Sequence, residues 1–132
     1  MIGWLWPDTT TTFGCRRAIY EGAAAGGAQA QALAWAYTVF GGDTPVAVAP
    51  ATGPAVASAA AIVAVGLSVW LLRRPNAAAA GLILIGAVGM AAGLGTTAIG
   101  WAWLIAVALA VNGLRGAIGW RRMKRVDPDV EL

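Results

Sequence analysis

The chain has 132 residues, of which 59% are hydrophobic and 11% are charged, and its formal net charge is +3. A soluble domain usually carries about 25% charged residues, so this composition argues against a soluble globular domain and for a single membrane-embedded one. The nine lysines and arginines stand at the ends of apolar runs. Membrane topology alone explains that placement, and we therefore expect no nucleic-acid partner.

Residue types that carry chemistry are scarce. Histidine is absent and Cys15 is the only cysteine, which removes the commonest ligand of haem, copper and zinc and leaves no internal disulfide. No Ser/His/Asp or Cys/His set can form, and we expect the lone thiol to be inert. The sequence therefore predicts no enzymatic activity, no catalytic residue, no cofactor and no metal site.

Residues 1–15 are too short and too polar to span a bilayer. Trp4 and Trp6 suit the headgroup level, where an amphipathic ring has one wet and one apolar end. Asp8 and the threonines that follow are favourable residues for the start of a helix. We expect an interfacial N-terminal segment here.

The first expected span covers residues 18–40 and is the least hydrophobic. It contains Glu21, Gln29 and Gln31 and only four strongly lipophilic side chains, so it would insert poorly without partner helices. The alternative is three spans preceded by an interfacial N-terminal helix.

Three further spans are expected at residues 54–72, 77–94 and 98–119. A loop with Pro45 and Pro50 covers residues 41–53, and a tight turn covers residues 95–97. Asn76 and Thr97 are the expected N-caps of the last two spans. The sequence therefore predicts an all-α polytopic membrane protein, with a bundle of four transmembrane helices over residues 16–125 and an acidic cytoplasmic tail at 126–132.

With four spans, every basic residue falls on one side of the membrane. Residues 16–17, 73–74 and 121–125 carry the cations there, whereas 41–53 and 95–97 carry none. Cytoplasmic loops of membrane proteins are enriched in lysine and arginine. The expected location is a bacterial-type inner membrane, with both termini in the cytoplasm.

Polar residues in the spans have a structural and a functional interpretation. Glu21 is a candidate ion-exchanging carboxylate, but its position four residues after Arg17 favours an ion pair near the interface. Gln29 and Gln31 point about 200° apart on a helix and need hydrogen-bond partners from neighbouring helices. Asn112 is the third polar candidate for a conduit.

Basic residues at the end of the last span suggest lipid contact. Arg115, Arg121 and Arg122 could hold an anionic lipid headgroup. The plainer interpretation is that Arg115 extends its side chain to the interface without a specific ligand. Membrane lipid is an expected partner in either case.

Small residues recur at spacings that let helix backbones approach closely. In the first span they lie on the side opposite Glu21 and Gln29, so this helix has contact surfaces on two sides. One neighbour would be the rest of this chain, and the other a different polypeptide. The residues expected to pack between helices or to contact a partner are Gly22, Gly26, Gln29, Gln31, Gly86, Gly89 and Gly93.

These observations favour an accessory or scaffolding subunit of a larger inner-membrane complex, for which an energy-transducing host, respiratory or photosynthetic, is expected. Other transmembrane polypeptides are then its partners. The alternative is a small homo-oligomeric transporter or channel that uses Glu21, Gln29 and Asn112.

Overall fold

The computed structural model describes residues 5–38, 49–94 and 98–131, and within them it contains four helices and no strand. The helices are α1 (Thr12–Thr38), α2 (Ala49–Arg73), α3 (Ala77–Leu94) and α4 (Ala98–Val126). The all-α prediction is confirmed. The expected loop residues 41–48, the turn at 95–97 with the Thr97 cap, and Trp4 lie outside the described residues.

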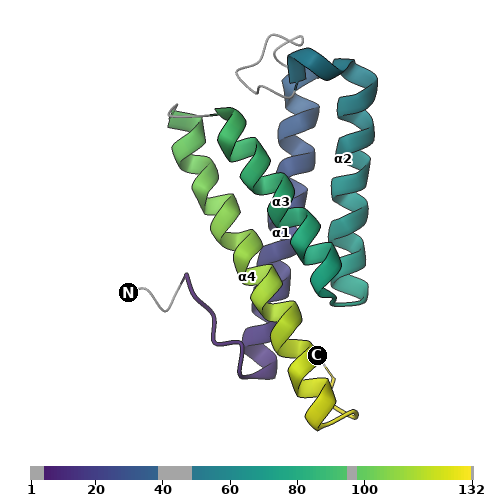
Figure 1. Cartoon of the computed structure of the whole chain (residues 1–132), viewed down its shortest axis with the longest axis vertical. Helices are drawn as coiled ribbons and strands as arrows, with labels where there is room; N and C mark the ends of the chain where they lie inside the picture. The colour runs from purple at the N-terminus through teal and green to yellow at the C-terminus, as the bar shows by residue number, and fades with distance from the viewer. Residues whose placement is uncertain (1–4, 39–48, 95–97, 132) are drawn as a thin grey trace.

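Successive helices run in opposite directions, and α1 occupies the centre of the bundle (Figure 1). It packs against α2, α3 and α4, and α3 also contacts α2 and α4. Among the described residues α2 and α4 do not contact each other. The helix with the most polar residues in its apolar part is therefore the one that contacts all three others.

Small residues of α1 allow the neighbouring helices to pack closely against it. Ala18 and Ala25 are fully buried, and Gly22 lies directly against Gly113 of α4. A Cβ added to either of these glycines would stand 2.5 Å from the other's Cα, so the two helix backbones touch where they cross. On the α2 side, a Cβ on Gly26 would meet the hydroxyl of Ser68.

The helix predicted for residues 77–94 is present with both of its predicted bounds. Its predicted cap is also correct, because the Ala79 N–H donates to Asn76 Oδ1 at 2.7 Å, which satisfies an otherwise unpaired amide of the first turn. Helix α4 continues seven residues beyond Gly119, to Val126. Lysine and arginine are good helix formers, and they are favourable at a helix C-terminus.

Two helices begin earlier in the chain than the sequence predicted. Helix α1 begins inside the segment expected to be interfacial, and Thr11 caps it by accepting from the Gly14 N–H at 3.0 Å. Helix α2 begins at Ala49, so the loop prediction was wrong for residues 49–53. Pro50 lies in its first turn, where a missing N–H costs nothing. The first turns of α2 lie at an angle to the rest of the helix (Figure 1), as a proline inside a helix such as Pro54 produces.

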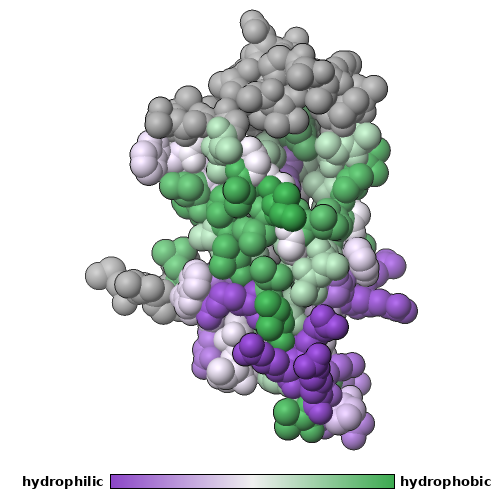
Figure 2. Space-filling model, in the orientation of Figure 1, coloured by the Kyte–Doolittle hydropathy of each residue, from purple (hydrophilic) through white to green (hydrophobic). Residues whose placement is uncertain are grey.

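Large apolar side chains cover the outer surface of α2, α3 and α4. Ile62, Ile85 and Ile105, one from each helix, are 60–72% exposed. Figure 2 shows this apolar surface as a band across the middle of the molecule, with the hydrophilic residues gathered at the end that holds the C-terminus. By length and composition, one described helix, Gly100–Val126, could cross a membrane.

Candidate functional site

The carboxylate of Glu21, the candidate ion-exchanging group of α1, accepts hydrogen bonds from side chains of two helices. Arg17 Nε donates to Glu21 Oε1 at 2.9 Å, the ion pair expected from their spacing. Asn112 Nδ2, from α4, donates to Glu21 Oε2 at 2.7 Å. Asn112 is fully buried, so two of the three residues expected in a conduit are bonded directly to each other at the α1–α4 contact.

The same asparagine holds the segment that precedes α1. Asn112 Nδ2 also donates to the carbonyl oxygen of Leu5 at 2.8 Å, so both amide hydrogens are used. Arg115 Nη1 lies 3.5 Å from Asn112 Oδ1, and Arg115 Cζ lies 4.2 Å from the centre of the Trp6 ring. An arginine over a tryptophan face is a favourable cation–π pair. We call this set of residues, Glu21, Asn112, Arg115, Leu5 and Trp6, the Asn112 cluster.

The side chain of Glu21 is partly exposed. It is 18% exposed and lines a shallow pocket of about 410 Å³ together with Phe13, Arg17 and Tyr20. No group of three histidine, cysteine, aspartate or glutamate side chains suited to a metal ion occurs in the described part of the chain. The carboxylate can therefore serve as an anchor for α4, or as a single exchangeable group facing outward.

Gln29 is satisfied inside the chain. It is 6% exposed, and its Nε2 donates to the carbonyl oxygen of Ile83 in α3 at 2.7 Å. Gly86 leaves the space for it, because a Cβ there would meet Gln29 Oε1. A similar bond joins α4 to α3, from Trp103 Nε1 to the Ala87 carbonyl oxygen at 3.0 Å.

The residues expected to contact other helices divide into two groups. Gly22, Gly26, Gln29 and Gly86 contact this chain's own helices. Gln31 and Gly89 are exposed, and a Cβ on Gly89 would meet no atom within 4 Å. The side-chain surroundings of Gly93 lie outside the described residues. Both faces that the sequence assigned to different neighbours, the one with Gly26 and the one with Gln29, are thus covered by this chain.

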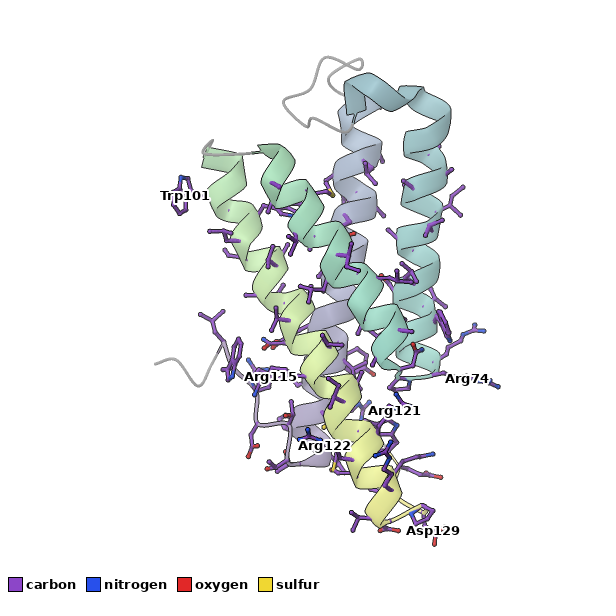
Figure 3. All side chains as sticks on the ribbon, viewed as in Figure 1. Arg74, Trp101, Arg115, Arg121, Arg122 and Asp129 are labelled. Atoms are coloured by element: carbon purple, nitrogen blue, oxygen red, sulfur yellow. The ribbon has the colours of Figure 1, made fainter. Side chains whose placement is uncertain are left out.

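The three arginines expected to share a lipid headgroup point to different places (Figure 3). Arg115 belongs to the Asn112 cluster. Arg121 lines a cavity with Arg73 and other residues of the α2–α3 connection. Arg122 lines a separate pocket of about 380 Å³ beside Val126. Sequence spacing did not reveal this separation, because residues 73 and 121 come together only through the tertiary fold.

The lone thiol is enclosed near the start of α1. Cys15 is fully buried and its Sγ donates to the carbonyl oxygen of Thr9 at 3.2 Å. Burial raises the pKa of this thiol, and the Asp8 carboxylate acts in the same direction. The pKa of Asp8 itself is lowered by hydrogen bonds from the hydroxyl and N–H of Thr10. A neutral, enclosed thiol is a poor nucleophile.

The chain was compared with protein-family models, curated proteins and solved structures. No protein-family model matches it, and neither a curated protein nor a solved structure matches it. The features of the molecule that bear on its function are therefore the Asn112 cluster, the internal bonds of α1 and the surfaces that the bundle leaves exposed.

Proposed function

We propose that the protein is an integral membrane protein whose four helices all cross the bilayer, with the basic end of the bundle in the cytoplasm. The apolar band supports this proposal, because soluble proteins rarely expose contiguous apolar surface of this extent. The hydrophilic residues lie together at one end (Figure 2), as the positive-inside rule requires.

Gln29 and Glu21 of α1 are compatible with a membrane interior. Gln29 bonds Ile83, and Glu21 bonds Arg17 and Asn112, so neighbouring helices and the same helix supply the partners that lipid cannot. Inserted by itself, α1 would leave these groups unsatisfied. Its central position in the bundle supports a fourth span in preference to a surface helix.

We further propose that the protein is an accessory subunit that holds another transmembrane polypeptide in a larger inner-membrane complex. The observation that carries this proposal is the outer face of α1, which faces away from the bundle between α2 and α4. Its exposed residues, Tyr20, Ala24, Gly27 and Gln31, follow one another at intervals of four, three and four, so they form one stripe. A Cβ on Gly27 would meet no atom within 4 Å.

The chemistry of this stripe indicates a helix as its occupant. Gln31 lies fifteen residues after Arg16, about 22 Å along the helix axis, and therefore within a hydrocarbon core about 30 Å thick. An exposed primary amide at that depth is costly in lipid, whereas a neighbouring helix can bond it. Ala24 and Gly27 beside it are small enough for a second backbone to approach closely.

The test compares two exposed glycines with equal free space. Gly27→Leu adds a large side chain to the proposed docking stripe, and Gly66→Leu adds the same side chain to the outer face of α2; neither glycine has an atom within 4 Å of an added Cβ. After gentle detergent extraction, the tagged wild type and Gly66→Leu should migrate in a high-mass complex on a native gel. Gly27→Leu should migrate mainly as the free protein.

Thermal unfolding of both purified variants controls for folding, and we expect both to melt within a few degrees of the wild type. Equal recovery of the two variants in the complex would remove the α1 stripe as the docking surface. A wild type that migrates only as a small homo-oligomer would contradict the accessory-subunit proposal.

The exposed part of Glu21 supports one alternative, a small homo-oligomeric transporter. The carboxylate faces the pocket with Phe13 and Tyr20, where an ion could reach it. Glu21→Asp keeps the charge and Glu21→Gln removes it, so an ion-exchange role requires activity in the first variant and none in the second. Under our proposal both variants appear in the complex, and neither loses a transport activity in vesicles.

A further inference from the structure

A second feature of the basic end is a cavity of about 600 Å³ between the α2–α3 connection and the last turns of α4. Trp120, which is 7% exposed, and Leu72 form apolar parts of its wall. The charged lining comes from segments almost 50 residues apart in the sequence, and consists of Arg73, Arg74, Arg121, Lys124, Arg125 and Glu131.

The charge of this cavity is strongly unbalanced. Among the described lining residues, five cationic side chains face one carboxylate, that of Glu131, so the net charge of these side chains is +4. None of the five cations has an ion-pair partner within the described residues, where Arg17–Glu21 is the ion pair. Lys124 instead lies over the Trp120 ring, 5.6 Å from its centre. Five like charges around one space repel one another, and an anion placed among them relieves that repulsion.

Apolar surface adjoins the cavity on the side of the bilayer. Val65, Val69 and Leu72 follow one another at intervals of four and three residues along α2, so they form one stripe, and they are 50%, 42% and 43% exposed. A molecule with an anionic head in the cavity could therefore lay an apolar tail along α2. Arg74 and Arg121 lie at this end of the bundle (Figure 3), at the level where headgroups would meet the protein.

We propose that this cavity binds the phosphate headgroup of an anionic phospholipid of the cytoplasmic leaflet. The proposal rests on the membrane insertion proposed above, but not on the partner polypeptide. Clusters of arginine and lysine next to a transmembrane helix attract anionic lipids, and pockets between helices bind their headgroups specifically. Arginine adds bidentate hydrogen bonds to phosphate oxygens. Arg115 and Arg122 do not take part, in contrast to the site expected from the sequence.

The experiment uses the full-length purified protein in a mild detergent, titrated with phosphatidylglycerol or with phosphatidylcholine and read by native mass spectrometry. Two variants remove one positive charge each from adjacent positions of α4. Arg121→Ala removes a cation of the cavity, whereas Arg122→Ala removes one that lies outside it. Glu131→Gln removes the carboxylate of Glu131 from the lining.

The wild type should bind one phosphatidylglycerol in clear preference to phosphatidylcholine. Arg121→Ala should weaken that binding about five-fold or more, since each cation near an anionic lipid contributes on the order of this factor. Arg122→Ala should change it less than two-fold, and Glu131→Gln should strengthen it. Equal losses in Arg121→Ala and Arg122→Ala would overturn the proposal, because nonspecific attraction depends on charge and not on the cavity.

Competition with inorganic phosphate distinguishes a site for a lipid headgroup from a site for the free phosphate ion, because both ligands present a phosphate group. Millimolar phosphate should not displace the lipid, since the free ion lacks the apolar tail that Val69 and Leu72 would hold. Displacement by phosphate at that concentration would overturn the lipid proposal in favour of a soluble ligand. Failure of the protein to enter lipid nanodiscs would refute the proposed membrane insertion itself, whereas insertion without a lipid preference would refute only the present inference.

Discussion

The contact between Gly22 and Gly113 gives the most direct test of the bundle. Replacing Gly113 by alanine places a Cβ 2.5 Å from the Cα of Gly22. Carbon atoms pack at about 3.5–4.0 Å, so the two helices must move apart by about 1 Å. The atoms that the new Cβ meets are backbone atoms of Gly22, which leaves no flexible side chain to yield. Overpacking of this kind costs about 1–3 kcal/mol.

The matched control is Gly66→Ala, since a Cβ on Gly66 meets no atom within 4 Å. Both substitutions gain the same conformational advantage of alanine over glycine in a helix, about 0.5–1 kcal/mol. The free energies of unfolding of the two variants should therefore differ by the overpacking cost alone, about 1–3 kcal/mol, with Gly113→Ala the less stable. Separation of α1 from α4 should also lengthen the neighbouring bond from Asn112 to Glu21.

The assay is unfolding in mixed micelles at increasing mole fractions of sodium dodecyl sulfate, followed by tryptophan fluorescence and by circular dichroism. Gly22→Ala should reproduce the loss, because the contact is reciprocal. Two variants, Gly113→Ala and Gly66→Ala, with the same unfolding midpoint would show that α1 and α4 do not cross at this pair of glycines, and the central position of α1 would lose its main steric support.

Three other outcomes follow from the described geometry. Gln29→Leu should destabilise the bundle by about 0.6–2 kcal/mol in the same unfolding assay, because it removes the bond to Ile83; an unchanged midpoint would contradict that bond. Iodoacetamide should modify Cys15 slowly in the folded protein at pH 8 and rapidly after unfolding, because burial raises the pKa of the thiol and leaves little thiolate in the folded state. Equal modification rates by mass spectrometry would contradict the burial of Cys15. In a Cys15→Ser background, a membrane-impermeant maleimide added to intact cells should label Thr96→Cys and not Asp129→Cys; the reverse pattern would refute the proposed topology.

The helices of the second half were predictable because their signals are local. The run 77–94 is apolar throughout, and Asn76 stands where an N-cap belongs, so both its bounds and its cap agree with the structure. The ends of α2 and α4 were placed too far inward, since prolines in a first turn and cations in a last turn both resemble loop residues in a sequence. The pairing of Arg17 with Glu21 followed from their spacing alone.

The Asn112 cluster was not predictable in the same way. Glu21, Asn112 and Arg115 were each candidates, but the sequence contains nothing that joins them to Leu5, which lies 107 residues from Asn112. Trp6 suited the membrane interface, whereas in the structure the guanidinium of Arg115 covers its ring. Contacts between a nonhelical segment and a distant helix leave no periodic pattern, so only the tertiary structure reveals them.

The central place of α1 has a consequence for biosynthesis. The ribosome makes this helix before α3 and α4, yet the Ile83 acceptor for Gln29 follows 54 residues later, and the Asn112 donor for Glu21 follows 91 residues after its acceptor. At about 5–20 residues per second, the second delay lasts roughly 5–18 s. In the membrane topology proposed above, a marginally hydrophobic helix with open amide and carboxylate groups waits at the insertion machinery for α3 and α4 throughout that interval. Slow codons between residues 38 and 98 should therefore expose α1 to quality-control proteolysis, whereas the same codons after residue 113 should not.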